Sequence, residues 1–307
     1  MHLILPHAAS PQWPASALDA LALPHLQRLL ADMPISARLH EPEGESPHPL
    51  MPHEQVEAQA RGWPRNGPWP WAALATAEPD SGAQAWITPC HWQVGMDQVV
   101  MRDPHELQLS DAESQALLQA IQPYMQDDGL QVRWHDALHW HAQGPLLGGL
   151  APASLARVSG QNVRPWVMDG SLPAALRRLQ SELQMLLYHH PVNEAREARG
   201  QATVNAFWVH GAGALSSAHT THTGDPVRCL HLLSAPARQG DLAAWQAAWT
   251  ALDREVLAPL ASSTEPLTLT LCSDTTAHSY TRRPRPWWRR LFARPDARAA
   301  LHALLTS

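Results

Sequence analysis

The sequence predicts an α/β fold in which a mixed, mainly parallel sheet is flanked by helices, with a small mixed or antiparallel β section in the middle. Segments with helical apolar spacing alternate with single short apolar runs over most of the 307 residues, which favours a sheet with crossover helices. Two short runs at 130–134 and 138–141 resemble a hairpin. We therefore expect one α/β domain over 1–307, with about 85–165 as an inserted or mixed section.

The elements of the N-terminal half follow from apolar spacing and turn residues. His2 to Leu5 is short and apolar and predicts a buried first strand. Pro24 opens a helix in which Leu26, Leu29 and Leu30 fall on one face, since proline is tolerated at the first helical position. The other elements expected here are a helix at 53–63 and strands at 85–94 and 98–102.

In the C-terminal half, Ser110 and Glu113 form a capping box that begins a helix, which the Asp-Asp-Gly turn at 127–129 ends. A leucine stripe predicts a helix at 173–188, which His190-Pro191 ends because a residue before proline avoids helical geometry. The remaining expected elements are one or two helical turns at 193–200, a buried strand at 203–209 closed by Gly211 and Gly213, a helix at 242–260, a strand at 267–271 and a terminal helix.

Composition excludes some classes of protein. The net charge of −6 argues against bulk electrostatic binding of polyanions. Cys90, Cys229 and Cys272 are far apart and make no zinc spacing, which favours reduced thiols in the cytoplasm. The N-terminus lacks the pattern of a signal peptide, and no apolar run approaches the ~18 residues of a membrane span. We expect a cytoplasmic protein with no membrane contact.

The densest polar segment, HHPVNEAREARG, follows the predicted helix at 173–188. A functional interpretation is a pocket for a small anionic or polar ligand, with Arg196 as a forked donor. A structural interpretation is a joint between two helices, in which Asn193 caps the second helix and Glu194 pairs with an arginine. The candidate ligand-binding residues of this segment are His189, His190, Asn193, Glu194 and Arg196.

The segment VNAFWVHGAG predicts a central strand followed by a turn. Gly211 and Gly213 would let backbone N–H groups approach a ligand, and the carboxyl end of a parallel strand is where α/β folds usually bind ligands. A buried tryptophan with a satisfied neighbour explains the same pattern without a ligand. The candidates here are Asn205, Trp208, His210, Gly211 and Gly213.

Other histidine groups suggest a metal site. His219, His222 and Asp225 are three residues apart, a spacing that places ligands on one face of a helix, although their Thr- and Gly-rich surroundings favour a loop. His139 and His141 have the spacing of two residues on one face of a strand, where surface exposure is the favoured explanation over metal binding. Asp274 and His278 complete the candidate ligands, and Mn or Zn is the divalent metal considered.

The tail from Arg282 to Arg298 interleaves arginines with Trp287, Trp288 and Phe292. Such a mixture can hold phosphates and stack on bases, which makes nucleic acid a candidate partner. It also fits a docking helix with buried tryptophans and solvated arginines, and the acidic remainder of the chain favours that alternative. A basic aromatic tail and helix is therefore expected over 282–307.

From about Ala85 onward, the order of motifs resembles the RpfE-type regulatory proteins of bacteria, a family often described as phosphoglycerate mutases. The motifs are DPHELQLSDAES, DDGL, SELQMLLYHHPVNEAREARG, VNAFWVHGAG and PWWRRLF. The chain is also similar, more weakly, to the cofactor-independent phosphoglycerate mutases of the alkaline-phosphatase superfamily. ALPHLQRLLADM is similar to their first helix, VNAFWVHGAG to a later strand and turn, and LTLTLCSDTTAHS to the strand before their Asp-His metal pair. The resemblance implies an alkaline-phosphatase-like sheet.

The metal chemistry of those enzymes is not matched residue by residue. They hold two divalent metals with Asp and His ligands and attack phosphate with a Ser or Thr. Here the first strand, LILPHAAS, has no aspartate, and Asp274 is followed by Thr275 instead of histidine. No Asn-Ser nucleophile turn is visible. The resemblance thus favours a fold inherited without the full ligand set.

Three functional hypotheses follow. The favoured one is a catalytically degenerate regulatory protein that binds a small anionic ligand or a protein partner. The second is a metal-dependent phosphoryl-transfer enzyme of the mutase or phosphatase type, with His219, His222, Asp225, Asp274 and His278 as rearranged ligands. The third is a nucleic-acid or protein-binding module that acts through its Arg/Trp-rich tail.

Overall fold

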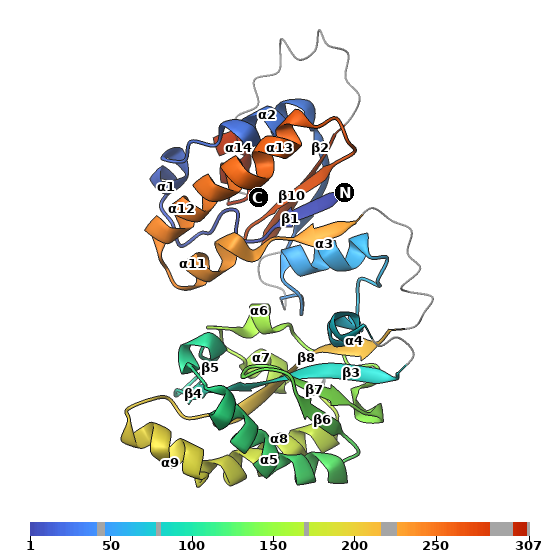
Figure 1. The fold of residues 1–307 in the computed structure, drawn as a ribbon, viewed down its shortest axis with the longest axis vertical. Coiled ribbons are helices and arrows are strands. Elements are labelled where there is room, and N and C mark those ends of the chain that lie inside the picture. The colour runs from blue at the N-terminus through green and yellow to red at the C-terminus, as the bar shows by residue number, and fades with distance from the viewer. Residues whose placement is uncertain (42–46, 78–80, 169–171, 216–225, 283–296, 306–307) are drawn as a thin grey trace. The chain divides into compact units, whose positions relative to one another are not determined.

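The computed structural model describes residues 1–41, 47–77, 81–168, 172–215, 226–282 and 297–305. The chain divides into two compact units (Figure 1). Unit 1 combines Met1–Arg61 with Thr223–Ser307, and unit 2 is the continuous stretch Gly62–His222. The section predicted at about 85–165 therefore lies within unit 2. None of the helices in the described part of the chain is long and apolar enough to span a membrane.

Unit 1 is built on a five-stranded mixed sheet in the order β2-β11-β10-β1-β9. β1 pairs in parallel with both β9 and β10, whereas β11 is antiparallel to β10 and to β2. The predicted mixed α/β architecture is confirmed. The strands are β1 (His2–Leu5), β2 (Ile35–His40), β9 (Val227–Cys229), β10 (Thr268–Cys272) and β11 (Thr276–Thr281).

Helices cover both faces of this sheet. Leu3 and Leu5 point into a core with Trp245 and Trp249, whereas Ile4, between them, packs near Val56 on the other face, because successive strand side chains alternate. The helices are α1 (Ala15–Asp19), α2 (Pro24–Asp32), α3 (Pro52–Ala60), α11 (Ser234–Arg238), α12 (Leu242–Leu252), α13 (Ala258–Ser262) and α14 (Ala297–Ala303), with a 3-10 turn η3 (His231–Leu233) and a π-helical turn η4 (Asp253–Leu257). The helix predicted at 242–260 is thus α12, η4 and α13 in succession.

Unit 2 is built on an antiparallel four-stranded sheet in the order β6-β7-β3-β8. The hairpin predicted at 130–141 is confirmed as β6 and β7. The strands are β3 (Ala83–Cys90), β4 (Trp92–Val94), β5 (Val99–Met101), β6 (Gln131–Trp134), β7 (Trp140–Gln143) and β8 (Ala206–Ala214). β4 and β5 form a separate hairpin.

Two long helices, α5 and α8, pack against one face of this sheet. Ser110 caps α5 with the predicted capping box, accepting from the Glu113 N–H while the Glu113 carboxylate accepts from the Ser110 N–H. The helical elements of unit 2 are α4 (Trp71–Thr76), η1 (Pro104–Leu107), α5 (Asp111–Asp127), η2 (Pro145–Leu147), α6 (Leu155–Val158), α7 (Arg164–Met168), α8 (Ala174–Tyr188) and α9 (Pro191–Ala198).

The structure corrects the interpretation of β8. The strand does not end before Gly211 but continues to Ala214, and it runs antiparallel to β3, so it offers no carboxyl end of a parallel strand. The glycines are required by close packing and backbone geometry. A Cβ at Gly211, where φ is +61°, would lie 3.1 Å from the Trp71 Cβ, and one at Gly213 would lie 3.1 Å from the Pro70 Cβ.

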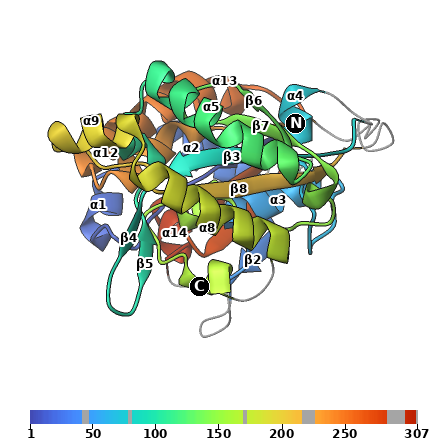
Figure 2. The same ribbon diagram turned by 90° about the horizontal axis from the view of Figure 1, so that it is seen from below.

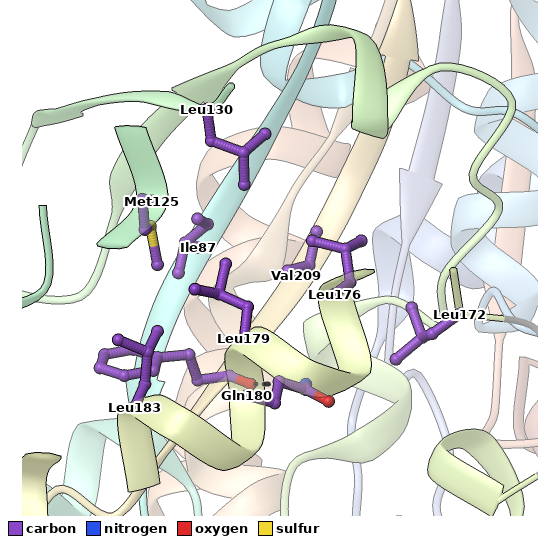
Figure 3. Close-up of a pocket in the computed structure, with 10 residues that line it drawn as sticks. Ile87, Met125, Leu130, Leu172, Leu176, Leu179, Gln180, Leu183 and Val209 are labelled. Carbon is purple, nitrogen blue, oxygen red and sulfur yellow. Dashed lines mark hydrogen bonds between the residues drawn. The ribbon is translucent and has the colours of Figure 1, made fainter. Parts of the chain in front are cut away.

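A small apolar cavity lies under α8 in unit 2 (Figure 3). Leu176, Leu179 and Leu183 of α8 face Ile87 and Val209 of the sheet across it. Its volume of about 20 Å³ has room for roughly one water molecule, which would find almost no polar partner there. The cavity is therefore a packing defect and not a ligand site.

Candidate functional site

The carboxyl ends of the parallel strands β1, β9 and β10 bring polar side chains together in unit 1. His7 and Ser10 follow β1, Asp274 follows β10, and Ser234 follows β9 through η3. His53, at the start of α3, lies with its ring centroid 6.1 Å from that of His7. Open α/β sheets bind ligands at this edge. We call the group His7, Ser10, His53, His231, Ser234 and Asp274 the rim cluster.

His7 is at the centre of the rim cluster. Its Nδ1 lies 3.1 Å from the Ser234 Oγ, and its Nε2 lies 3.8 Å from the Asp274 Oδ1. The Ser10 hydroxyl donates to the Asp274 Oδ2 over 3.3 Å. The Ser234 Oγ is also 3.5 Å from the His231 Nδ1, so its single proton serves one imidazole at a time.

The backbone that carries His7 is held in an unusual conformation. His7 has φ of +54°, a left-handed geometry that costs a non-glycine residue about 1–2 kcal/mol. Two indoles of α12 fix this loop, since Trp245 Nε1 donates to the His7 carbonyl and Trp249 Nε1 to the Ala8 carbonyl. Strained residues that the surrounding structure holds in place are concentrated at functional sites, which supports a role for His7.

Two imidazoles of the rim cluster, those of His7 and His231, have lowered pKa values. Burial lowers the pKa of His7 to about 4, and the charges of Arg238 and His231 lower it further. The pKa of His231 is lowered as well, because desolvation of its ring outweighs the opposing Glu57 carboxylate and the Arg238 charge adds to the effect. At neutral pH the cluster thus offers the uncharged imidazoles of His7 and His231 and two hydroxyls beside the Asp274 carboxylate, with the Glu57 carboxylate and the Arg238 guanidinium nearby.

The rim cluster does not form a ready metal site. In the described ranges, no three His, Cys, Asp or Glu side chains are arranged to hold a metal ion. His278 lies on β11, opposite Leu271 of β10 and Arg38 of β2. His219, His222 and Asp225 lie outside the described residues. The described side chains therefore do not fit a divalent metal.

The polar segment at 189–196 is occupied by structural contacts. The side-chain amide of Asn193 is buried and makes hydrogen bonds to the backbone. It donates to the Leu187 and Val204 carbonyls and accepts from the Val204 N–H. His190, and not Asn193, caps α9 by accepting from the Val192 N–H. His189 and Glu194 are exposed.

Arg196 is fully buried and forked, but its partners belong to the scaffold. It donates to the carbonyls of Ala202 and Leu107 and to the Glu113 carboxylate. The pKa of Glu113 is lowered despite its desolvation, because Ser110 and Arg196 bond the carboxylate. The arginine therefore joins α9 to the start of α5.

The candidates on β8, and Asn205 just before it, have structural partners too. The Asn205 amide bonds both the N–H and the carbonyl of Trp92, and the buried Trp208 indole donates to the Ala153 carbonyl. His210 lies 3.0 Å from the Thr88 hydroxyl. Its pKa is lowered by burial and by His139.

His139, His141 and His210 belong to one aromatic group on the sheet face opposite α5 and α8. The rings of His139 and His141 are 5.7 and 5.6 Å from that of Trp86, and His139 is 6.2 Å from His210. Gln84 accepts from the His141 Nε2, and Asp136 accepts from the His139 Nδ1, so both rings have defined partners. The group is packed and hydrogen-bonded in the scaffold of unit 2.

Most of the predicted tail lies outside the described residues. Two of its arginines are described, and both bond to the chain: Arg282 donates to the Glu265 and Leu260 carbonyls, and Arg298 donates to the Leu21 carbonyl. These two side chains support docking against unit 1.

Sequence reasoning missed the rim cluster apart from Asp274. The strand β9 is only three residues long and was not predicted. His231 and Ser234 could therefore not be placed at the end of a strand. His7 and Ser10 directly follow the predicted first strand in LILPHAAS, and this position was a usable signal. The first strand lacks the expected aspartate, but the residues that follow it belong to the rim cluster.

Comparisons with known proteins give a fold-level result. No family model and no curated protein matches the chain. A cofactor-independent phosphoglycerate mutase from Thermoplasma acidophilum is 15% identical over 99% of each chain, with a TM-score of 0.33. The PH0037 protein from Pyrococcus horikoshii is 9% identical over 99% of this chain and 95% of its own, with a TM-score of 0.51. The first likeness is too weak to support an argument, and the second shows a shared fold alone.

Proposed function

We propose that the chain is a cytoplasmic regulatory protein of the RpfE type on a phosphoglycerate-mutase-like scaffold, and that it binds a small anionic ligand at the rim cluster without turning over a phosphate ester. The observation that carries the proposal is the charge balance at the ends of β1, β9 and β10. Asp274 is the one carboxylate of the rim cluster, and it accepts a hydrogen bond from Ser10. A two-metal phosphoryl-transfer site needs several carboxylates to offset two dications.

The same groups suit an anion such as phosphate. Ser234 supplies a hydroxyl donor, and the neutral imidazoles of His7 and His231 supply N–H donors. Arg238 lies close enough to lower the pKa of His7 and of His231, and at His231 the Glu57 carboxylate has a larger effect in the opposite direction. Hydrogen bonds from such donors to an ionised group are stronger than those between neutral groups.

The test is calorimetric titration of chelator-treated protein with inorganic phosphate and with 3-phosphoglycerate. We expect saturable binding that weakens at least fivefold in Ser234→Ala and in Arg238→Gln. Arg254→Gln is the matched control, since Arg254 is an exposed arginine of unit 1 that pairs with Glu255. Absent binding, or equal binding in Arg238→Gln and Arg254→Gln, would overturn the proposal.

Metal-dependent phosphoryl transfer is the competing function, and the same protein tests it. The ring centroid of His53 lies 6.1 Å from that of His7 and 5.7 Å from that of His231, and His7 lies beside Asp274. Turnover of a phosphate ester that requires added manganese or zinc, and that Asp274→Asn abolishes, would replace the binding function with an enzymatic one.

A further inference from the structure

A hollow of about 270 Å³ lies in unit 2 between the β4–β5 hairpin and the start of α7. Figure 2 shows the hairpin extending beyond β3 and β8. Trp92 and Val99 line the hollow from the hairpin, and Val163 and Val167 line it from the other side. These side chains pack against a buried core that includes Trp208. The hollow is therefore an apolar recess, and its residues are distinct from those of the rim cluster in unit 1.

Hydrogen bonds hold the two sides of the hollow together. The Val163 N–H donates to the Val99 carbonyl over 2.8 Å, and the Gly160 N–H donates to the Met101 carbonyl over 2.8 Å. The side-chain oxygen of Asn162 accepts from the Val99 N–H over 3.1 Å. The walls of the recess are thus fixed by the fold, so a ligand that enters it does not have to order them.

Arg164 gives the hollow its charge, since it is the one ionisable residue among those that line it. Its Nη1 donates to the backbone carbonyl of Asp97 over 3.2 Å, which holds the guanidinium at the tip of the hairpin. This bond uses one of the five guanidinium N–H donors. In the described ranges no carboxylate forms an ion pair with Arg164. The guanidinium therefore keeps donors and a positive charge for a ligand.

Two further side chains that line the hollow are open to solvent. Val94 is 77% exposed and Met96 is 100% exposed. An apolar ligand in the hollow would remove part of this surface from water, which is favourable in proportion to the area covered. The unbranched side chain of Met96 can adapt to the shape of such a ligand.

We infer that the hollow binds a small apolar carboxylate, with its apolar body against Trp92, Val163 and Val167 and its carboxylate on Arg164. The planar guanidinium matches a carboxylate in geometry and charge. The volume lies just below the ~300 Å³ at which typical ligand pockets begin, so it suits a molecule of about the size of naphthoate. The exposed Asp97 beside the guanidinium disfavours a dianion such as a phosphate monoester.

The first experiment is calorimetric titration of the full-length protein with sodium 2-naphthoate and, separately, with the neutral 2-naphthalenemethanol. We expect saturable binding of naphthoate that weakens at least fivefold in Arg164→Met, and weaker binding of the alcohol that this change does not affect. Arg177→Met is the matched control, because Arg177 is an exposed arginine of unit 2 that also donates to a backbone carbonyl. Absent binding of naphthoate, or equal affinity for it in the two variants, would overturn the inference.

The second experiment locates the bound naphthoate by nuclear magnetic resonance of methionine methyl groups labelled with carbon-13. The ring current of naphthoate should shift the Met96 methyl signal, which Met96→Leu assigns, and should leave that of Met185 on α8 in place. Val167→Trp fills the hollow and should abolish the shift, with circular dichroism and the thermal midpoint confirming that the variant is folded.

A variant of the rim cluster separates this site from the one proposed in unit 1. Arg238→Gln should leave both the affinity for naphthoate and the shift of the Met96 signal unchanged. Naphthoate binding that Arg238→Gln weakens and Arg164→Met does not, or an unshifted Met96 signal in the saturated wild type, would place the ligand elsewhere and contradict the inference.

Discussion

Arg196 shows that a side chain whose chemistry suggests an anion site can instead be fully hydrogen-bonded within the fold. A forked guanidinium beside histidines predicts an anion site, yet in the structure each described partner of Arg196 is a group of the chain itself. A buried arginine of this kind holds two loops and a helix start together, because an unpaired buried carbonyl or carboxylate is costly.

We expect Arg196→Met to lower the free energy of unfolding by about 3–5 kcal/mol, since the change leaves the Leu107 and Ala202 carbonyls without their donor. Arg199→Met is the control. Arg199 is 52% exposed and pairs with the same Glu113, so its loss should cost about 1 kcal/mol or less. Urea denaturation followed by circular dichroism measures both, and similar losses in the two variants would contradict the structural role of Arg196.

His7 gives a pH prediction with a definite sign. Its folded pKa of about 4 lies below the usual value of 6.5, so the unfolded chain binds this proton more readily between those two pH values. The contribution of His7 to stability is complete above pH 6.5 and is lost as pH falls towards 4, by up to about 3 kcal/mol.

The matched variant is His7→Asn, because asparagine does not titrate and tolerates the positive φ of this position. Denaturation between pH 4 and pH 7.5 should show a shallower decline for the variant than for the wild type. Equal pH slopes in the two proteins would show that another group controls the acid sensitivity.

At the scale of elements, most of the helices and strands could be predicted, because their information is local. Leucine spacing located α8, the Ser110–Glu113 box located the start of α5, and the short apolar runs located β1 and β10. The strands β2, β9 and β11 were missed, and the direction of β8 was wrong. Nothing local in VNAFWVHGAG distinguishes a parallel from an antiparallel strand, and its glycines are explained by Trp71 and Pro70, which are distant in sequence.

α8 carries a prediction of its own, since its leucine stripe holds it to the sheet of unit 2. Leu183 is 1% exposed and lines the small cavity, so Leu183→Ala enlarges an existing void and should cost about 2–5 kcal/mol. Met185→Ala, two residues along on the solvent face, should change stability by less than about 0.5 kcal/mol. Thermal denaturation measures the stability of both variants. A small loss of stability in Leu183→Ala would mean that α8 is not packed as described.

At the scale of the whole molecule, the candidate site was beyond sequence reasoning for a topological reason. The rim cluster joins residues near positions 7, 53, 231 and 274, and these are far apart in sequence because unit 2 interrupts unit 1 between Arg61 and Thr223. Sequence patterns draw attention to segments where polar residues are close together in sequence, such as 189–196. Which strand ends become neighbours depends instead on the order of the strands in the sheet. The sheet order β10-β1-β9 is the fact that creates the cluster.

The division of the chain leads to the last prediction, that residues 62–222 fold independently. Unit 2 is continuous in sequence and contains its own apolar cores on the two faces of its sheet. Its length of about 160 residues is typical of an autonomous domain. We expect the isolated segment to show the circular dichroism of a mixed α/β protein and one cooperative thermal transition. Arg196→Met in this segment should lower the thermal midpoint as it does in the full chain, and a segment that unfolds without cooperativity would contradict independent folding.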